Sequence, residues 1–297
     1  MHVGILSRRA SLYSTKRLIQ AAEDRGHEVT VVDPLRCYIL VEREQPRMFH
    51  CDEEISGCDV VIPRIGASIT EYGLAVVNQF EILGVPVVNG YLGYARARDK
   101  STCMQLLAAR GLPVPKTLMA RHPGHVREFL RRVGGAPVVL KLTRGTQGVG
   151  VMLAETAESA ESILETMWST GQNILIQQFV HEARGRDMRL LVVGDEVVAA
   201  MRRYARGGDF RANIHRGGNG VNARPTPQTR TIAIEATQAL GLAVAGVDVI
   251  ETQRGPLLLE VNPSPGFEEL ERAAGGDIAG RIMDYAGSIA TRLRAVG

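Results

Sequence analysis

The sequence has 297 residues, which indicates two or three domains, and its 45% hydrophobic and 23% charged residues are ordinary for a globular enzyme. The net charge of +3 is too small to indicate a nucleic-acid partner, so we expect no direct contact with nucleic acid. No apolar run approaches the roughly 20 residues that span a bilayer, and the N-terminus lacks the apolar segment of a signal peptide. Four scattered cysteines without C-x-x-C spacing are typical of reduced thiols, so we expect a cytoplasmic protein without membrane contact.

The first hundred residues alternate strand-like and helix-like segments. Short apolar runs predict strands and longer amphipathic runs predict helices: strands at 3–7, 28–34, 59–66 and 85–89, and helices at 14–26 and 70–83. This alternation predicts a small parallel α/β domain, which we assign to residues 1–98. Ligands of such domains bind where the strands end. Ser7 and Arg64 stand at such ends, although residues there are more often ordinary loop residues.

Two further units are predicted after residue 98. A helix at 99–110 precedes GLPVPKT, whose two prolines exclude a helix and favour an extended entry into a new unit. We assign 99–180 to a central subdomain with the segments PVVLKLT (strand), VMLAET (strand), ESAESILETMW (helix) and NILIQQFV (strand). We assign 181–297 to a C-terminal subdomain with strands RLLVVG and EVVAAMRRYA, a helix at 227–241, a hairpin at 246–262 and a helix at 277–294.

Lys141 lies inside the apolar segment VVLKL, where an ammonium group is costly unless an anion meets it. The loop that follows holds Gly145, Gly148 and Gly150, and glycines let backbone N–H groups approach an anion closely. A strand follows this loop, whereas a helix follows the glycines of a Walker A loop or a Rossmann turn. The pattern predicts a β-hairpin that holds a polyphosphate. A flexible hairpin with a lysine that reaches solvent explains the pattern equally well.

The segment GVDVIETQRGPLLLEVNPSPG, residues 246–266, places two carboxylates and an amide inside apolar strands. A turn at TQRG would put Asp248 opposite Glu260, with Cβ atoms roughly 4.5–5.5 Å apart, and strand alternation puts Asn262 on the face of Glu260. Carboxylates this close repel unless a cation separates them, and oxygen ligands favour Mg²⁺ or Mn²⁺. These three residues are therefore a predicted metal site, and surface carboxylates on an edge hairpin are the alternative.

A nucleoside triphosphate with its metal, bound between two antiparallel sheets, explains both features together. QQFV, residues 177–180, would then present backbone groups to the base. The segment ARGGDFRANIHRGG, residues 205–218, carries three arginines, whose guanidinium groups suit carboxylates and phosphoryl groups. We predict an active-site loop there; a solvated basic loop and an RNA-binding arm are the alternatives, the second without aromatic support. No nucleophile stands out, as expected for phosphoryl transfer.

This combination resembles the ATP-grasp carboxylate–amine ligases over nearly the whole chain. The resemblance is greatest to the RimK family, whose members add glutamate to the C-terminus of a ribosomal small-subunit protein; it is carried by the stretches DVVIPRIG, RARDKSTCMQLLA, KLTRGTQGVGVMLAET, DFRANIHRGG, AGVDVI and EVNPSPG. It implies an α/β (α+β) chain with the ATP-grasp fold, in which an N-terminal parallel α/β domain precedes two antiparallel α+β subdomains that clamp ATP. It also implies a homo-oligomer, a tetramer in many members.

The resemblance assigns roles to individual residues. The residues implied to bind the nucleotide are Lys100, Lys141, Gly145, Gly148, Gln178, Phe179, Asp187, Arg211, Ala212 and Asn213. Arg211 and Asn213 would stand beside the reacting phosphoryl group as catalytic residues, while Gln178 and Phe179 would border adenine and Asp187 the ribose. Asp248, Glu260 and Asn262 would hold two Mg²⁺ or Mn²⁺ ions.

The implied reaction has two steps. An acceptor carboxylate attacks the γ-phosphorus of ATP to give an acyl phosphate and ADP, and the amine of glutamate then displaces phosphate to form an amide. The same chemistry on a coenzyme, or on an amino-acid carrier protein of lysine or arginine synthesis, is the first alternative. A non-catalytic ATP-binding regulatory module is the second. We expect Asp248→Asn to abolish ATP turnover with the fold intact, and Lys141→Ala to weaken nucleotide binding.

Overall fold

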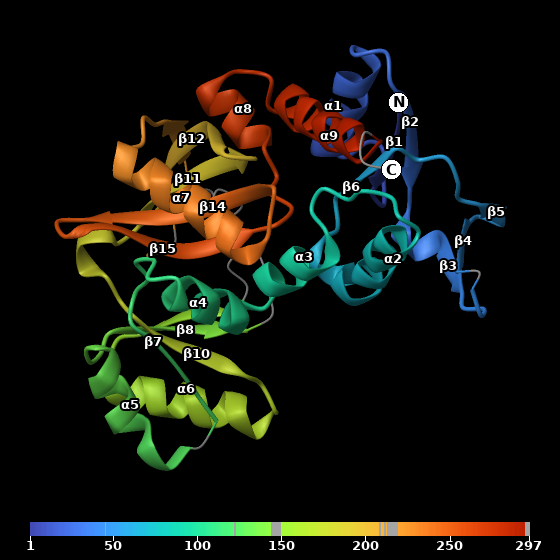
Figure 1. Ribbon diagram of the computed structural model, residues 1–297. Coiled ribbons are helices and arrows are strands. Elements are labelled where there is room, and N and C mark those ends of the chain that lie inside the picture. The colour runs from blue at the N-terminus through green and yellow to red at the C-terminus, as the bar shows by residue number, and fades with distance from the viewer. Residues whose placement is uncertain are drawn as a thin grey trace.

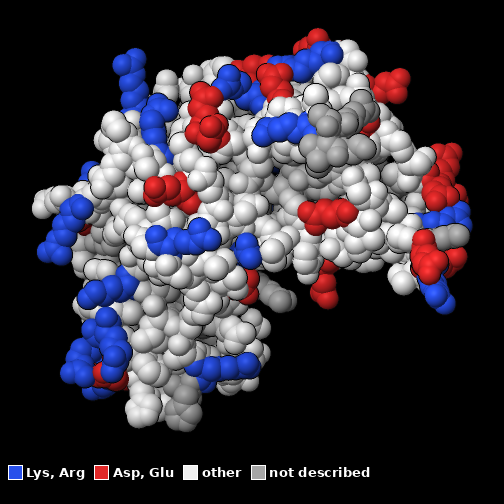
Figure 2. Space-filling view, in the orientation of Figure 1, with Lys and Arg blue, Asp and Glu red and all other residues white. Residues whose placement is uncertain are grey.

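The structure is a computed structural model that describes residues 1–44, 46–121, 123–143, 150–207, 209–210, 212 and 219–294. Three lobes are visible in Figure 1: an N-terminal lobe in blue and teal, a central lobe in green, and a C-terminal lobe in yellow to red. Acidic and basic side chains are interspersed over the face shown in Figure 2, as expected for a small net charge. None of the helices in these described ranges is long and apolar enough to cross a bilayer.

The N-terminal lobe contains a parallel sheet in the order β2-β1-β6. Its elements are β1 (His2–Leu6), α1 (Tyr13–Glu23), β2 (Glu28–Val32), β6 (Val60–Pro63) and α2 (Thr70–Ile82). The parallel pairing confirms the predicted α/β arrangement. The strand predicted at 85–89 was wrong, because only an isolated bridge between Val61 and Val87 forms there.

This lobe also contains a small antiparallel sheet that was not predicted, formed by β3 (Cys37–Leu40), β4 (Arg47–His50) and β5 (Glu53–Glu54). Two short 3₁₀ helices, η1 (Pro34–Arg36) and η2 (Ala67–Ile69), complete the lobe. Strands of two to four residues carry too little periodicity to be recognised in a single sequence.

Two helices connect the N-terminal lobe to the others: α3 (Tyr91–Arg98), which was not predicted, and α4 (Lys100–Ala109). Asp99 begins α4, because its side chain accepts a hydrogen bond from Thr102 N at 2.8 Å. The predicted boundary at residue 99 groups α4 with the central lobe. Its buried side chains, among them Met104 and Leu107, instead join the core of the C-terminal lobe.

The central lobe contains an antiparallel sheet in the order β7-β10-β8-β9. Its elements are β7 (Thr117–Ala120), η3 (Pro123–His125), α5 (Val126–Val133), β8 (Val138–Leu142), β9 (Val151–Ala154), α6 (Ala157–Ser169) and β10 (Ile174–Gln178). Val138 and Leu140 face the core beneath α5 and α6. Because side chains alternate along a strand, Val139 and Lys141 face the opposite side, toward the C-terminal lobe.

The C-terminal lobe contains an antiparallel sheet in the order β13-β12-β11-β14-β15. Its elements are η4 (His181–Ala183), β11 (Arg186–Val193), β12 (Glu196–Tyr204), β13 (Asn219–Asn222), α7 (Pro227–Leu240), β14 (Val244–Thr252), β15 (Gly255–Asn262), α8 (Glu268–Ala274) and α9 (Ile278–Arg294). Helix α7 begins at the N-cap Thr226 with proline at its first position and ends at Gly241, which has a φ of +77°. The long hairpin β14–β15 confirms the predicted pairing.

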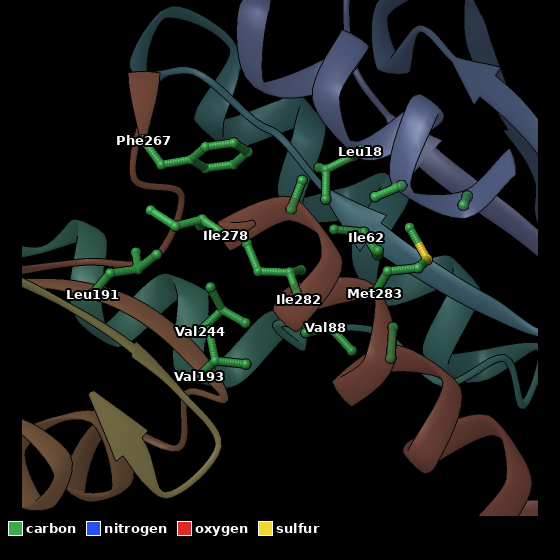
Figure 3. Packing of buried hydrophobic residues seen from close by; sticks show 14 of the residues in the cluster. Leu18, Ile62, Val88, Leu191, Val193, Val244, Phe267, Ile278, Ile282 and Met283 are labelled. Carbon is green, nitrogen blue, oxygen red and sulfur yellow. The ribbon is translucent and has the colours of Figure 1, made fainter. Parts of the chain in front are cut away.

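One hydrophobic core joins the N-terminal and C-terminal lobes (Figure 3). Leu18 and Ile62 of the N-terminal lobe pack in the same cluster as Leu191 and Val244 of the C-terminal sheet, with Ile282 of α9 between them. A shared core of buried side chains holds two lobes in one relative position. The cleft between the parallel sheet and the β14–β15 hairpin is therefore built on a rigid base.

Asn89 reinforces this junction with four hydrogen bonds. Its Nδ2 donates to Val244 O at 2.6 Å and to Pro263 O at 2.8 Å, and its Oδ1 accepts from Ala243 N at 2.7 Å and Val244 N at 2.8 Å. The side chain is 3% exposed, so all four bonds are shielded from water. One amide thereby fixes the start of β14 and the residue that follows Asn262.

We expect Asn89→Ala to lower the free energy of unfolding by about 3 kcal/mol, since it leaves buried backbone groups of two segments without partners. Urea denaturation monitored by circular dichroism measures this change. Asn78→Ala, which replaces an asparagine on α2 whose side chain makes no hydrogen bond to this junction among the described residues, is the matched control. A loss below about 0.5 kcal/mol for Asn89→Ala would contradict the assigned role.

Candidate functional site

A pocket lies between the sheets of the central and C-terminal lobes, bordered by the segment that links them. Predicted site residues from both sheets and from the link line it together: Lys141, Gln178, Phe179, Asp187, Ala212, Asp248 and Glu260. Lys100 and Asn262 line an adjoining groove that shares Glu260 with this pocket. The other predicted site residues, Gly145, Gly148, Arg211 and Asn213, lie outside the described residues.

The β14–β15 hairpin brings two predicted metal ligands together. Asp248 pairs directly with Glu260 in the ladder, as predicted from the turn at TQRG. A register shift next to this pair makes Leu259 an extra residue on β15. Because of this bulge, Leu258 enters the buried core while Leu259 and Glu260 both face the pocket. Without it, strict alternation would place Leu258 and Glu260 on the same face.

Asp248 is neutralised by two arginines that the sequence analysis did not identify. Arg189 Nε and Nη2 donate to its two carboxylate oxygens at 2.7 Å each, and Arg203 Nη2 lies 2.9 Å from Oδ2. Burial acts to raise the pKa of Asp248, but the two guanidinium groups outweigh it and lower the pKa to about 2. The expectation that Asp248 depends on divalent cations for its neutralisation is therefore corrected: the protein supplies the positive charge.

The remaining acceptor capacity of these side chains fits a hard cation. A carboxylate has about four lone-pair sites, and the arginines use three of those on Asp248, which leaves one on Oδ1. Among described residues the Glu260 carboxylate has no hydrogen-bond partner, and Asn262 Oδ1 accepts one bond, from Ser264 N at 3.0 Å. Two carboxylates and an amide match the ligand preference of Mg²⁺. Asp248, Glu260 and Asn262 remain the predicted ligands.

Lys141 faces the acidic hairpin from the opposite sheet. Burial lowers the pKa of Lys141 to about 8; attraction to Glu260 opposes this shift, and repulsion from Lys100 adds to it. The N-terminus of α4 is tied to the end of β8 by a 3.2 Å hydrogen bond from Lys100 N to Thr143 O. Both lysines also line a small pocket with Glu260. The structure thus gathers two of the four lysines at one side of Glu260.

The other end of the pocket is largely apolar. Val139 from the central sheet and Ile250 and Leu259 from the hairpin line it together with Phe179, whose ring centroid lies 4.9 Å from that of His181. Gln178 is fixed to the edge of the lobe, because its backbone N–H donates to Lys116 O at 2.8 Å. An apolar slot of this kind suits a flat heterocyclic ring.

Asp187 borders the same pocket, but its carboxylate is already held. Arg203 Nε and Nη2 donate to its oxygens at 2.6 and 2.7 Å. Arg203 is 2% exposed and the Asp187 side chain is 12% exposed, and burial raises the pKa of Asp187. A carboxylate in this state keeps lone pairs for a ligand hydroxyl.

The sequence contained a usable signal for the arginines that were missed. Arg189 stands two residues after Asp187 on β11, so strand alternation places both on one face, and Arg203 lies directly opposite Asp187 on β12. Arginines on a buried face that also carries acids predict ion pairs. Arg184 and Arg186 also line the pocket and had no such signal.

Comparison with known proteins agrees with this geometry. Residues 97–286 match the family model of the RimK-like ATP-grasp domain, and residues 1–92 match that of the RimK PreATP-grasp domain. A "Probable alpha-L-glutamate ligase" of Vibrio cholerae serotype O1 is 51% identical over 301 residues, which cover 100% of both chains. A protein of the same description from Pseudoalteromonas translucida is 52% identical over 285 residues, covering 96% of this chain and 95% of its own.

Solved structures share the fold. A RimK domain protein ATP-grasp from Sphaerobacter thermophilus superposes with a TM-score of 0.74 at 25% identity, covering 96% of this chain and 99% of its own. The ATP-grasp ligase PsnB, complexed with minimal precursor, Mg and ADP, gives a TM-score of 0.75 at 21% identity over 98% of both chains. The chain therefore belongs to the RimK family of ATP-grasp enzymes and is an ATP-dependent carboxylate–amine ligase.

Proposed function

We propose that this enzyme joins L-glutamate to the C-terminal carboxylate of an acceptor protein, a ribosomal small-subunit protein, in the cytoplasm. The main support for glutamate as the amine substrate is the full-length similarity to relatives described as probable alpha-L-glutamate ligases. The segment NPSPG after the hairpin, which resembles the ligases of ribosomal proteins, supports the acceptor. A homotetramer accompanies this proposal and is tested by size-exclusion chromatography with light scattering.

The first step transfers the γ-phosphoryl group of ATP. An oxygen of the acceptor carboxylate attacks the γ-phosphorus, the bond to the β-phosphate oxygen breaks, and an acyl phosphate and ADP result. Lys141 and Lys100 would hold phosphate oxygens, while Val139, Ile250 and Leu259 would enclose the base. Mg²⁺ held by Asp248, Glu260 and Asn262 would supply neutralisation of the phosphate charge, and two ions, or Mn²⁺, belong to the same proposal.

The second step forms the amide bond. The amine of glutamate attacks the acyl carbon and loses a proton, and phosphate leaves with the electrons of the acyl C–O bond. The acyl phosphate must be kept from water, which places it in the closed space between the two sheets. Arg211 and Asn213, which lie outside the described residues, remain the proposed catalytic residues beside the phosphoryl group.

We expect ADP release to require both glutamate and the ribosomal protein, and the acceptor mass to rise in glutamate-sized steps. Coupled ADP assays and intact-protein mass spectrometry measure both. ADP release with glutamate alone, without any acceptor, would instead favour free poly-glutamate synthesis. Release only with a carrier protein or a coenzyme would replace the ribosomal acceptor, and ATP binding without any release would favour a regulatory module.

A further inference from the structure

A second groove, which shares Glu260 with the nucleotide pocket, lies between the N-terminal lobe and the end of β15. Tyr72 and Asn78 of α2 and Arg98 at the end of α3 line it, together with Lys100, Glu260 and Asn262. Because the nucleotide pocket shares Glu260 with this groove, the two spaces meet at the predicted metal hairpin. A second substrate in this groove would lie next to the reacting phosphoryl group.

Arg98 lines this groove, and Arg64, which does not line it, lies close enough to Arg98 for the two guanidinium groups to repel each other. Arg64 Nη2 donates to Pro265 O at 2.6 Å, and Arg98 Nη2 donates to Ile65 O at 2.6 Å. In both side chains Nε is buried and has no partner among described residues. Within the same part of the chain, no carboxylate lies within ion-pair distance of either arginine. Burial, together with repulsion from the nearby Arg98, lowers the pKa of Arg64.

Aromatic rings, not acids, surround the pair. The Arg64 guanidinium carbon lies 5.7 Å from the centre of the Phe267 ring, and that of Arg98 lies 5.4 Å from the centre of the Tyr94 ring. Arg203, by contrast, is 2% exposed and contacts two aspartates. Neutral carbonyls and rings do not compensate a buried charge, which is costly without an anion. Two such groups side by side increase this cost, and the groove is also lined by the carboxylates of Glu71, Asp99 and Glu260.

Their positions in the fold also favour a ligand. Arg64 directly follows β6, at the carboxyl end of the parallel sheet, which is where ligands of α/β sheets bind. Arg98 stands two residues before Lys100, so their Cα atoms are at most about 7.6 Å apart. A ligand held by Arg98 therefore lies close to the phosphate-binding lysine.

We propose that Arg98, with Arg64 beside it, binds a carboxylate of the incoming amino-acid substrate in this groove. The inference rests on the proposed function and specifies where glutamate is held. A planar guanidinium fork matches a carboxylate with two parallel hydrogen bonds, and each arginine still has unused N–H donors. Glutamate retains both of its carboxylates throughout the reaction, so a fixed carboxylate site would hold the amine in place without taking part in chemistry.

The test measures KM separately for glutamate, ATP and acceptor in Arg98→Met and in Arg98→Lys. Loss of a charged hydrogen bond of this kind corresponds to a loss of about 10- to 100-fold in substrate affinity. We expect the KM for glutamate to rise by that factor in Arg98→Met and less in Arg98→Lys, with the KM values for ATP and acceptor within about threefold of wild type. Arg96→Met removes the same charge from the same helix outside the groove lining and serves as the matched control.

Substrate analogues sharpen the test. Glutamine and the α-amide of glutamate each lack one of the two carboxylates of glutamate. The wild-type enzyme should have a higher KM for one of these analogues than for glutamate, and Arg98→Met should lose this difference. An unchanged glutamate KM in folded Arg98→Met and Arg98→Lys overturns the inference while the proposed function stands. A rise in the acceptor KM alone would assign the arginines to the acceptor carboxylate and also overturn it. Absence of glutamate incorporation by wild type would overturn the proposed function and this inference together.

Discussion

Glu260→Gln is expected to reduce ligation about a thousandfold or more while changing the free energy of unfolding by less than about 1 kcal/mol. The carboxylate faces the pocket, has no hydrogen-bond partner among described residues, and pairs in the ladder with Asp248. Losing a proposed ligand of Mg²⁺ would remove several kcal/mol of charge stabilisation in the transition state, and each factor of ten in rate corresponds to about 1.4 kcal/mol. Initial rates of ADP release and thermal melts measure the two effects.

Asp248→Asn provides the contrasting case. Its carboxylate compensates Arg189 and Arg203 in a site where Asp248 is 4% exposed. Removing one partner of a buried ion pair leaves uncompensated charge and costs about 3–5 kcal/mol. The expectation from the sequence, that this variant keeps its fold intact, therefore changes: we expect a lower melting temperature as well as lost activity. Glu260→Gln is the cleaner test of the metal site.

Glu251→Gln is the matched control on the same hairpin. Glu251 pairs with Arg202 at 2.6 Å, but both side chains are more than a third exposed, and exposed ion pairs contribute little to stability. This variant should retain wild-type rates. Normal ADP release by Glu260→Gln, measured under the same conditions, would remove Glu260 from the metal site.

The parts of the site that could be predicted share a strong local signal. Charged residues inside apolar strands identified Lys141, Asp248 and Glu260, because burial makes charge costly unless it has a function. The turn at TQRG predicted the register of the two hairpin strands, and the structure confirms the pairing of Asp248 with Glu260. These inferences needed only strand periodicity and the cost of burial.

The parts that were missed depend on contacts between segments far apart in the sequence. Arg203 meets Asp187 across the consecutive strands β11 and β12, but it reaches Asp248 because β14 lies on the other side of β11, and no spacing in one sequence shows that neighbour. The bulge at Leu259 and the packing of α4 on the C-terminal sheet are likewise decided by tertiary contacts. The short strands of the N-terminal lobe escaped prediction because they are brief.

Lys141→Met is expected to abolish tight nucleotide binding and yet to stabilise the ligand-free protein at pH 7 by about 2 kcal/mol. Burial lowers the pKa of Lys141 from 10.5 to about 8. If fully realised, this shift would correspond to about 3 kcal/mol of destabilisation of the folded protein by the charged lysine. The side chain is partly exposed, which reduces this destabilisation. The triphosphate would supply the negative charge that this ammonium group lacks in the free protein. Thermal melts and nucleotide titrations measure both parts of the prediction.

The sign of the pH dependence follows from the same shift. Below pH 8 the folded protein carries a charged, desolvated Lys141, so the destabilisation of the folded state by this group is fully present. Between pH 8 and the unfolded pKa of 10.5 the unfolded chain holds the proton and the folded protein does not, so this group makes stability rise with pH. The increase should disappear in Lys141→Met. Unfolding by urea at pH 7 and pH 9 in both proteins tests this difference.

Nucleotide binding should reverse the shift and take up a proton. At pH 8 about half of the Lys141 side chains are neutral in the free protein, and a bound triphosphate would favour the charged form, so about half a proton should enter per ATP. Calorimetric titrations in buffers with different ionisation enthalpies measure that uptake, and ATP affinity should fall as the pH rises above 8. Lys116→Met, a substitution on a lysine that does not line the pocket, should leave the uptake unchanged. Binding without proton uptake in wild type would show that the phosphates do not meet Lys141.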